Sequence, residues 1–378
     1  MRQQASLWIV ALLILLPACA PPAPEPSPVG EAPLFAELRR TVEAFRASAG
    51  IPGLSAAAGY EGRLQWAEGF GLADVENRVP ARAETVYRLA SISKPITAVA
   101  TLQLAERGRL DLDAPIRTYV PSFPKKRWPV TARQILCHQS GIRHYNGSWF
   151  EFNLTVPFRS PSEAIQVFQD DPLVAEPGTK VVYSTFAYVL LGAAIESAAA
   201  EPYLDYVERN IFIPAGMEHT QADSVHAIIP NRSRGYRFNA AGKLENCDLV
   251  DTSYKLPGGG LSGTAPDLVR FALAVRQGTL LEPETVRSMW EPQRLRDGTL
   301  TPFGLGWRIE ETAGRRIVGH SGNQNGVTTH LVLQPESGCV VALMANLEKA
   351  PLPELGNQIL ALLEKLAPAT SPARPSRQ

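Results

Sequence analysis

The sequence has few cysteines and no excess of charge of either sign. Its 378 residues include 4 cysteines, and 37 basic side chains balance 37 acidic ones. Beyond Cys19, the cysteines are Cys137, Cys247 and Cys339, and none has the Cys-x-x-Cys spacing of a metal site or redox pair. One disulfide among these three and three buried free thiols both stay open. The balanced charge argues against a nucleic-acid partner and a polybasic membrane patch.

Motifs of several enzyme classes are also missing. The 6 histidines show no metal-ligand spacing, and no Gly-x-Ser-x-Gly occurs, which argues against an α/β-hydrolase. Gly258, Gly260 and Gly263 match the dinucleotide-binding pattern, but they follow Pro257 and no strand–helix–strand unit. We expect residues 257–263 to form a loop that leads into the helix predicted over residues 267–275. The sequence therefore predicts a protein that uses neither a metal ion nor a cofactor.

The N-terminal apolar run is too short to span a bilayer. Leu7 to Leu16 follows the positive charge of Arg2, which is typical of a signal peptide. The run leads into Pro17, Ala18 and Cys19, which resembles the end of a bacterial lipoprotein signal, with Cys19 as the lipid-modified first residue. An ordinary secretory signal with an incidental cysteine is the alternative.

We therefore expect an exported lipoprotein with one folded domain. Residues 1–18 form the expected signal peptide, and the proline-rich residues 19–33 form an extended linker. Residues 34–366 form the folded domain, and the polar residues 367–378 a disordered tail. Only the lipid would hold the mature chain to a membrane, on its periplasmic or extracellular face.

Ser91 and Lys94 lie at the start of a segment that predicts a buried helix. The segment from Pro95 to Glu106 is apolar on nearly all sides, and Pro95 fits only the first turn of a helix. Residues three apart share a helix face, so the lysine amine can reach the serine hydroxyl. A serine needs an adjacent base to act as a nucleophile, and burial lowers the pKa of a lysine toward that role.

The Ser-x-x-Lys pattern is weak evidence on its own. About one match is expected by chance in a chain of this length, and a second match does occur at Ser122 and Lys125. That match lies in a proline-rich polar stretch that opens no helix, so we interpret it as a loop. The assignment of Ser91 therefore depends on its companion motifs.

Two further segments can place polar side chains in a cleft. Tyr183 follows a Pro-Gly turn and precedes a helix predicted to begin near Thr185, although most tyrosines are buried aromatics with a bonded hydroxyl. The second segment, His320 to Asn323, follows a predicted strand that ends at Gly319. A polar hairpin loop is the plainer interpretation of that segment.

The distribution of patterns predicts an α+β fold. Strands are expected at both ends of the chain and helices between them, which favours one antiparallel sheet built from both ends, flanked by terminal helices, beside a mainly helical lobe. Ser91 would lie where the two parts meet. The expected helices are 34–47, 95–108, 131–137, 161–168 with a Ser160–Glu163 capping box, 185–200, 267–275 and 353–366, and the expected strands are 54–60, 63–68, 315–319, 327–333 and 339–344.

Taken together, the motifs resemble the serine beta-lactamase and penicillin-binding family. The match comprises Ser91-x-x-Lys94, then Tyr183 with Thr185, then His320 to Gly322, over most of the mature chain. Within the family, the chain is similar to the class C and esterase-type branch, above all to the mitochondrial serine beta-lactamase-like proteins. The resemblance implies the beta-lactamase/transpeptidase-like fold.

The resemblance also implies residue roles. Ser91 attacks a carbonyl group, and Lys94 and Tyr183 share the role of base, with a Lys94 ammonium expected to lower the pKa of the phenol. The backbone N–H groups of Ser91 and Asn323 would form the oxyanion hole, beside substrate contacts from Thr185 and from His320, Ser321 and Gly322.

Two positions depart from the family pattern. Thr185 replaces an asparagine whose amide contacts the substrate, and His320 replaces a lysine that binds a substrate carboxylate. A histidine of ordinary pKa loses its charge between about pH 5 and 8, so a preference for anionic substrates would strengthen as the pH falls. Both changes favour a peptidase or esterase over a pure beta-lactamase.

We therefore expect a serine hydrolase that acts through an acyl-enzyme intermediate on small peptide, amide or ester substrates. The alternatives are a penicillin-binding sensor that is acylated without turnover, and a non-catalytic scaffold that forms assemblies. The sequence says nothing of the oligomeric state.

Overall fold

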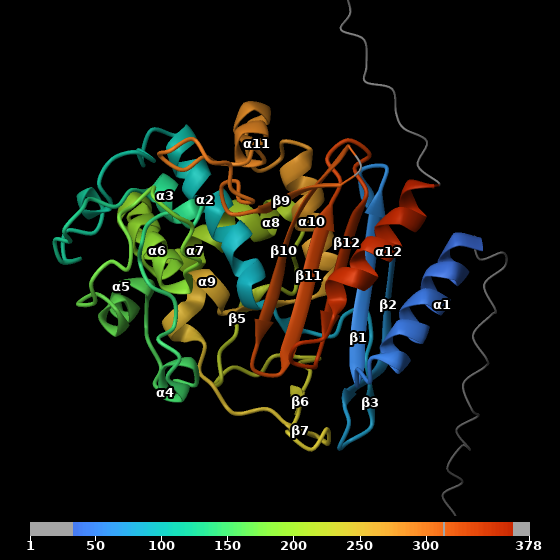
Figure 1. Cartoon of the computed structure of the whole chain (residues 1–378). Helices are drawn as coiled ribbons and strands as arrows, with labels where there is room; N and C mark the ends of the chain where they lie inside the picture. The colour runs from blue at the N-terminus through green and yellow to red at the C-terminus, as the bar shows by residue number, and fades with distance from the viewer. Residues whose placement is uncertain (1–32, 313, 366–378) are drawn as a thin grey trace, which may run out of the picture.

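The computed structural model describes residues 33–312 and 314–365 (Figure 1). The predicted signal peptide, Cys19 and the predicted C-terminal tail lie outside these residues, as does the linker apart from Pro33. Pro33 is the first described residue of helix α1 (Pro33–Ser48).

One seven-stranded antiparallel sheet joins the two ends of the described chain. Its order is β3-β2-β1-β12-β11-β10-β9, and β1 pairs with β12 from Leu54 opposite Ala345 to Gly59 opposite Val340. The strands are β1 (Gly53–Tyr60), β2 (Arg63–Asp74), β3 (Val79–Pro80), β9 (Arg308–Thr312), β10 (Arg315–Gln324), β11 (Val327–Leu333) and β12 (Val340–Ala345). The predicted α+β fold, with one sheet built from both chain ends, is confirmed.

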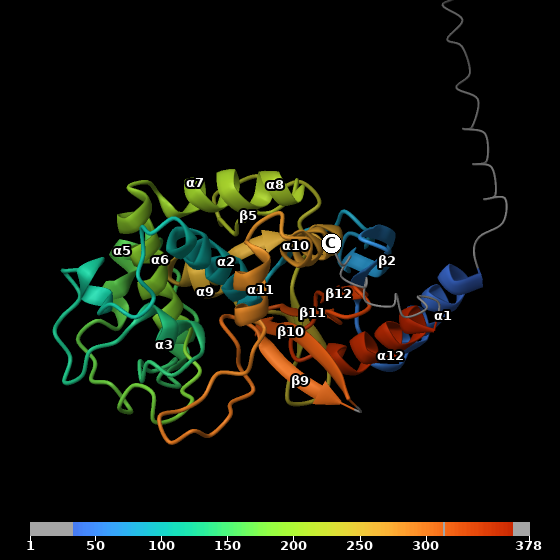
Figure 2. The ribbon, with the colours of Figure 1, turned by 90° about the horizontal axis from the view of Figure 1, so that it is seen from above.

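Helices cover both faces of this sheet (Figure 2). Helix α1 and helix α12 (Leu352–Glu364) pack on one face, and helix α10 (Ala265–Arg276) packs on the other. Side chains alternate between the two faces: in β12, Val341 and Leu343 belong to the core under α1 and α12, whereas Val340 and Ala342 belong to the larger core shared with the helical lobe.

The helical lobe lies beside the sheet in Figure 1, next to β10. Its centre is α2 (Ser93–Glu106), which contacts α6 (Thr185–Ala199) and α9 (Leu256–Gly259). The other elements between β3 and β9 are β4 (Tyr87–Arg88), η1 (Ala90–Ile92), η2 (Ile116–Thr118), α3 (Ala132–Leu136), α4 (Trp149–Phe152), α5 (Pro161–Ala164), η3 (Ile165–Val167), α7 (Tyr203–Val207), η4 (Glu208–Phe212), α8 (Ile213–Ala215), β5 (Gln221–Ala222), β6 (Tyr236–Phe238), β7 (Leu244–Asn246), η5 (Ser253–Lys255), β8 (Leu261–Gly263) and α11 (Pro283–Met289).

The sheet extends further at one edge than the sequence predicts. Strand β10 continues through Gln324, so His320 to Asn323 lie within the strand and not in the loop after it. Pairing with β11 overrides the weak strand preference of glycine and asparagine. The edge strand β9 was not predicted, because its alternating charged side chains lie at the surface and only Ile309 gives an apolar signal.

Two other predictions need correction. Residues 257–263 are not a loop: they contribute to helix α9 and strand β8, which pairs with β4. The helix predicted over residues 161–168 divides into α5 and η3. Its capping box is only half formed, because Glu163 accepts from the backbone N–H of Arg159 instead of that of Ser160.

The described cysteines are free thiols, with Cys137 and Cys339 buried and Cys247 partly exposed. Within residues 33–312 and 314–365, no cluster of three or more acidic, histidine or cysteine side chains has the geometry of a metal site. None of the helices in these ranges combines the length and apolar character that crossing a membrane requires.

Asn346 joins the two ends of the chain inside the sheet. Its side chain is fully buried, accepts from the N–H of Gly53, and donates to the carbonyl oxygens of Leu72 and Ala73. Asn346→Ala leaves these backbone groups without partners, so we expect it to lower the free energy of unfolding by about 2–4 kcal/mol.

Urea unfolding measures this change. Asn357→Ala, at an exposed position of α12, is the matched control and is expected to stay within about 0.5 kcal/mol of the wild type. Equal midpoints for the two variants would contradict the role of Asn346.

Candidate active site

Ser91 lies where the helical lobe meets the sheet. It is the central residue of η1, which contacts β10 and β11 and leads directly into α2. The preceding residue, Ala90, has a positive φ of 49°, a conformation that is costly for a residue with a Cβ and that often occurs at functional sites. The local backbone is therefore held in place by its surroundings, and it presents Ser91 at the start of the buried helix as predicted.

Lys94 lies one turn further on and is completely buried. Its Nζ is 3.1 Å from Ser91 Oγ, 3.1 Å from Thr185 Oγ1 and 2.7 Å from the carbonyl oxygen of Gly258. Three elements therefore meet at this amine: η1 with α2, the start of α6, and α9. The Gly-rich segment, which sequence analysis treated as a loop, supplies one of the three partners.

Burial lowers the pKa of Lys94 well below its ordinary range, and the charge of Lys255 lowers it further. A neutral amine offers two N–H groups and one lone pair. The Gly258 carbonyl can only accept, so it takes one N–H, and the two hydroxyl groups share the other N–H and the lone pair. When Thr185 accepts, the lone pair faces the Ser91 hydroxyl, and Lys94 can remove its proton.

Tyr183 completes this group but does not behave as the sequence predicts. Its hydroxyl interacts with the Ser91 side chain, and Lys94 Nζ lies 4.8 Å from its ring centroid. Burial raises the pKa of Tyr183, and the interaction with Ser91 offsets this only in part. The expected lowering by a Lys94 ammonium is wrong, because the same burial favours the uncharged amine. The uncharged amine of Lys94 can therefore accept a proton, whereas the phenol of Tyr183 keeps its own.

Two neutral histidines hold the segment that carries Tyr183. His138 Nδ1 accepts from the N–H of Ser184, and His144 Nδ1 accepts from the N–H of Thr185, at 3.3 and 3.2 Å. The rings of His138 and Tyr183 are 4.3 Å apart. Burial, together with Lys94, lowers the pKa of His138 strongly and that of His144 to about 3. Both rings therefore act as uncharged acceptors.

Strand β10 forms the opposite side of the site. Asn323 lines the same cavity as Ser91. A side chain at Gly322 would come within 2.7 Å of the Leu89 carbonyl oxygen, so glycine allows η1 to approach the strand closely. Thr329 Oγ1 on β11 also donates to this carbonyl, at 2.9 Å. These contacts fix Ser91 relative to the backbone of Asn323.

His320 is buried and neutral, contrary to the sequence-based expectation. Its Nδ1–H donates to the carbonyl oxygen of Ser321 at 2.7 Å, and its ring lies 6.3 Å from that of Tyr183. Burial, together with Lys94, lowers the pKa of His320 to about 3. The expected loss of charge between pH 5 and 8 is therefore wrong for this residue, which carries no charge in that range. Ser321 Oγ is 2.9 Å from His330 Nδ1.

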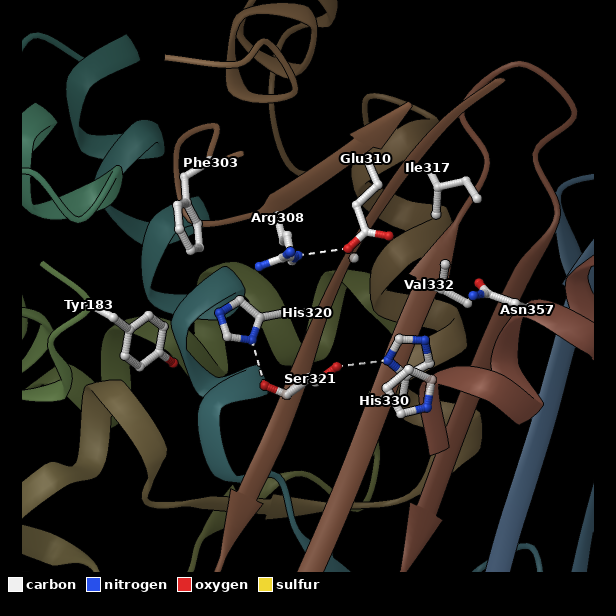
Figure 3. A pocket seen from close by; sticks show the side chains of 12 residues that line it. Tyr183, Phe303, Arg308, Glu310, Ile317, His320, Ser321, His330, Val332 and Asn357 are labelled. Carbon is white, nitrogen blue, oxygen red and sulfur yellow. Dashed lines mark hydrogen bonds and ion pairs between the residues drawn. The ribbon is translucent and has the colours of Figure 1, made fainter. Parts of the chain in front are cut away.

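Two cavities border the residues around Ser91 and Tyr183. The Ser91 pocket, of about 80 Å³, is lined by Ala90, Ser91, His144, Tyr145, Phe152, Thr185, Lys255, Gly258, Gly259, Asn323 and Gln324. The strand groove, of about 440 Å³, begins at Tyr183 and Phe303, passes His320 and Ser321, and reaches His330 and Asn357 near α12 (Figure 3). Tyr183 borders the groove, whereas Ser91 borders the pocket.

The structure brings the predicted residues Ser91, Lys94, Tyr183 and Thr185 together, with Asn323 across the pocket from Thr185. Sequence reasoning missed the roles of His138, His144 and Lys255. No sequence pattern connects His138 or His144 to the start of α6. Lys255 lies in a segment for which the sequence predicts neither a helix nor a strand, and nothing in its spacing points to Ser91.

Comparison with known proteins agrees with this geometry. The family model described as "Beta-lactamase" matches residues 38–364. The human mitochondrial serine beta-lactamase-like protein LACTB is 31% identical, over 80% of this chain and 75% of the relative. The octameric penicillin-binding protein homologue from Pyrococcus abyssi is 28% identical, with a TM-score of 0.77 over 87% of this chain and 77% of that chain.

A D-stereospecific amidohydrolase from a Streptomyces species is 25% identical, with a TM-score of 0.72 over 89% of this chain and 99% of that chain. The family match covers nearly all of the described residues, and the resemblance inferred from the motifs is confirmed. The chain belongs to the beta-lactamase family and is a serine hydrolase.

Proposed function

We propose that Ser91 is the nucleophile of an amide- or ester-hydrolysing enzyme, with Lys94 as its base and Tyr183 as a proton relay. One observation carries this proposal: the fully buried Lys94 amine, with its lowered pKa, lies 3.1 Å from Ser91 Oγ. A buried neutral lysine beside a serine hydroxyl supplies the base that serine chemistry requires.

Acylation then proceeds in balanced proton transfers. Lys94 Nζ takes the proton of Ser91 Oγ as this oxygen forms a bond to the substrate carbonyl carbon. The new ammonium passes a proton to Tyr183, whose own phenol proton goes to the leaving group as the carbonyl–leaving group bond breaks. The high pKa of the buried phenol suits this role, because the phenol is protonated before and after the step.

Deacylation reverses these transfers, with water in place of the leaving group. Water gives a proton to the Tyr183–Lys94 pair and attacks the acyl carbon, and Ser91 recovers its proton. The backbone N–H groups of Ser91 and Asn323 stabilise the negative oxygen in both steps, a contribution worth about 3–4 kcal/mol in enzymes of this kind. The close packing of η1 on β10 supports this assignment.

The cavities favour small substrates. The Ser91 pocket of about 80 Å³ admits only a short acyl chain, whereas the groove of about 440 Å³ beyond Tyr183 admits a larger leaving group. Small peptides, amides and esters fit this arrangement. The relative from Streptomyces is described as an amidohydrolase, which supports amides as one class.

The nucleophile can be identified by covalent labelling. We expect a fluorophosphonate to label Ser91, and Ser91→Ala to abolish both labelling and hydrolysis of 4-nitrophenyl acetate. Ser122→Ala, at the second Ser-x-x-Lys match, is the control and should label as the wild type does. Peptide mapping that places the label on Ser122 would contradict the assignment, and stoichiometric acylation without turnover would indicate a penicillin-binding sensor instead.

The base can be tested by its pH dependence. The active neutral form of Lys94 exists above its pKa, and burial moves that pKa down. We therefore expect the acid limb of kcat/KM for a neutral ester to lie well below the pH of about 10.4 at which an unperturbed lysine titrates.

Lys94→Arg keeps a cation that cannot lose its proton, so it should reduce kcat/KM by about 10⁴-fold or more at every pH. Its thermal unfolding should show that the domain still folds. An acid limb that Lys94→Arg retains, together with substantial activity, would assign the base to another group.

We also propose export and lipid attachment at Cys19, which rests on the N-terminal sequence alone. In a bacterial host, wild-type protein should partition with membranes, and Cys19→Ala should move it to the soluble fraction. Cys247→Ala, at a described cysteine, is the control and should leave partitioning unchanged. Equal solubility of wild type and Cys19→Ala would rule out the lipid anchor.

A further inference from the structure

Lys255 is a second buried lysine at the active site. The side chain is 1% exposed, and its Nζ has no hydrogen-bond partner among the residues that the structure describes. Its charge nevertheless has aromatic neighbours, since Nζ lies 5.0 Å from the ring centroids of Phe152 and Tyr254 and 5.7 Å from that of Tyr145. Such contacts attract a cation but offer its N–H groups no acceptor.

The Lys255 side chain borders the Ser91 pocket. Lys255 lines this pocket together with two of its aromatic neighbours, Tyr145 and Phe152. Its charge also lowers the pKa of Lys94 and of His144, both at the same site. Among the described residues that line the pocket, none is acidic. A buried donor of three hydrogen bonds therefore borders an 80 Å³ cavity that holds no negative charge.

An unpartnered buried cation is costly, and proteins rarely keep one without a use. We propose that Lys255 is a specificity-determining residue that binds a carboxylate on the acyl part of the substrate. This inference rests on the proposed function, because that mechanism gives the phenol proton of Tyr183 to the leaving group. The leaving group then lies in the strand groove that Tyr183 borders, and the acyl chain lies in the Ser91 pocket beside Lys255.

The charged groups around Lys255 are consistent with an anionic ligand. Arg88 repels the positive charge of Lys255, and Asp223 attracts that charge. Asp223 is already paired with both Arg88 and Arg232, so it does not neutralise Lys255. His144 is uncharged in the neutral range. Lys94 is the remaining cation when protonated, and a substrate carboxylate would reduce the repulsion between the two lysines.

These neighbouring groups and the burial of Lys255 determine the pH range in which its side chain is charged. Burial, with Arg88, lowers the pKa of Lys255 to about 7 in the absence of substrate. The cation is present below that pKa and lost above it. A preference for carboxylate over neutral substrates in kcat/KM, which reports the free enzyme, should therefore weaken as the pH rises through about 7.

The test uses matched substrates that differ in one group. The 4-nitroanilides of succinate and glutarate carry a free carboxylate on the acyl part, and their carboxamide analogues have nearly the same size without the charge. The measured quantity is the ratio of kcat/KM for the carboxylate over the carboxamide, in which effects on Ser91, Lys94 and Tyr183 cancel. At pH 6 we expect a wild-type ratio of about 10 to 100, the usual value of a charged hydrogen bond.

Three variants distinguish Lys255 from its neighbours. Lys255→Met replaces the cation with an apolar chain of similar length that suits an aromatic surrounding, and it should bring the ratio close to 1 at every pH. Lys243→Met removes an exposed lysine in the β6–β7 turn and should leave the ratio unchanged. His320→Gln should leave the pH dependence of the ratio intact, because His320 carries no charge there.

Product binding provides a readout that needs no turnover. Calorimetry with glutarate should show binding at pH 6 that Lys255→Met weakens at least ten-fold. A wild-type ratio near 1, or a ratio that Lys255→Met leaves unchanged, overturns the inference and leaves the hydrolase proposal standing. Lys255-dependent glutarate binding without hydrolysis of any substrate would overturn the hydrolase proposal and leave the carboxylate site standing.

Discussion

The active site depends on the burial of one lysine side chain, that of Lys94. Lys94 is completely buried between α2, α6 and α9, and within the described part of the chain its amine has two hydroxyl groups and one carbonyl as hydrogen-bond partners. This enclosure makes the charged form unfavourable, so the amine is a base at a pH where an exposed lysine would be an acid. Every other feature of the site either maintains this enclosure or uses the base that it creates.

The fold supplies the enclosure from segments far apart in the sequence. The sheet formed by both chain ends provides β10, and the helical lobe provides α2 with a core buried on all sides. Arg88 links these parts just before Ser91, since it pairs with Asp223 and donates to the carbonyl of Asn325 beyond the end of β10. Ser91 is therefore positioned by the contact between two packed units, which is where pockets commonly form.

Local sequence patterns predicted the longer helices and most strands of the main sheet, but not the charge states of the buried side chains. Ser91 and Lys94 could be placed because helix geometry relates residues three apart, and the sheet followed from the strands at both ends. The pKa of His320 could not be predicted, because it depends on burial beneath Tyr183 and near Lys94, which come from other elements. The pKa values of His138 and His144 could not be predicted either, because their hydrogen bonds to Ser184 and Thr185 at the start of α6 span 46 and 41 residues of sequence.

Lys94 and Lys255 are both buried at the active site, and they differ in their hydrogen-bond partners. We infer that this difference, more than burial, gives the two lysines different roles. Among the described residues, the Lys94 amine has three hydrogen-bond partners and the Lys255 amine has none, although both side chains are at most 1% exposed. Each positive charge makes the other less favourable, so neutral Lys94 stabilises a charged Lys255. An anion beside Lys255 would remove part of this penalty and let Lys94 accept the serine proton more easily. The same contact that selects a substrate would then assist the proton transfer that begins its reaction.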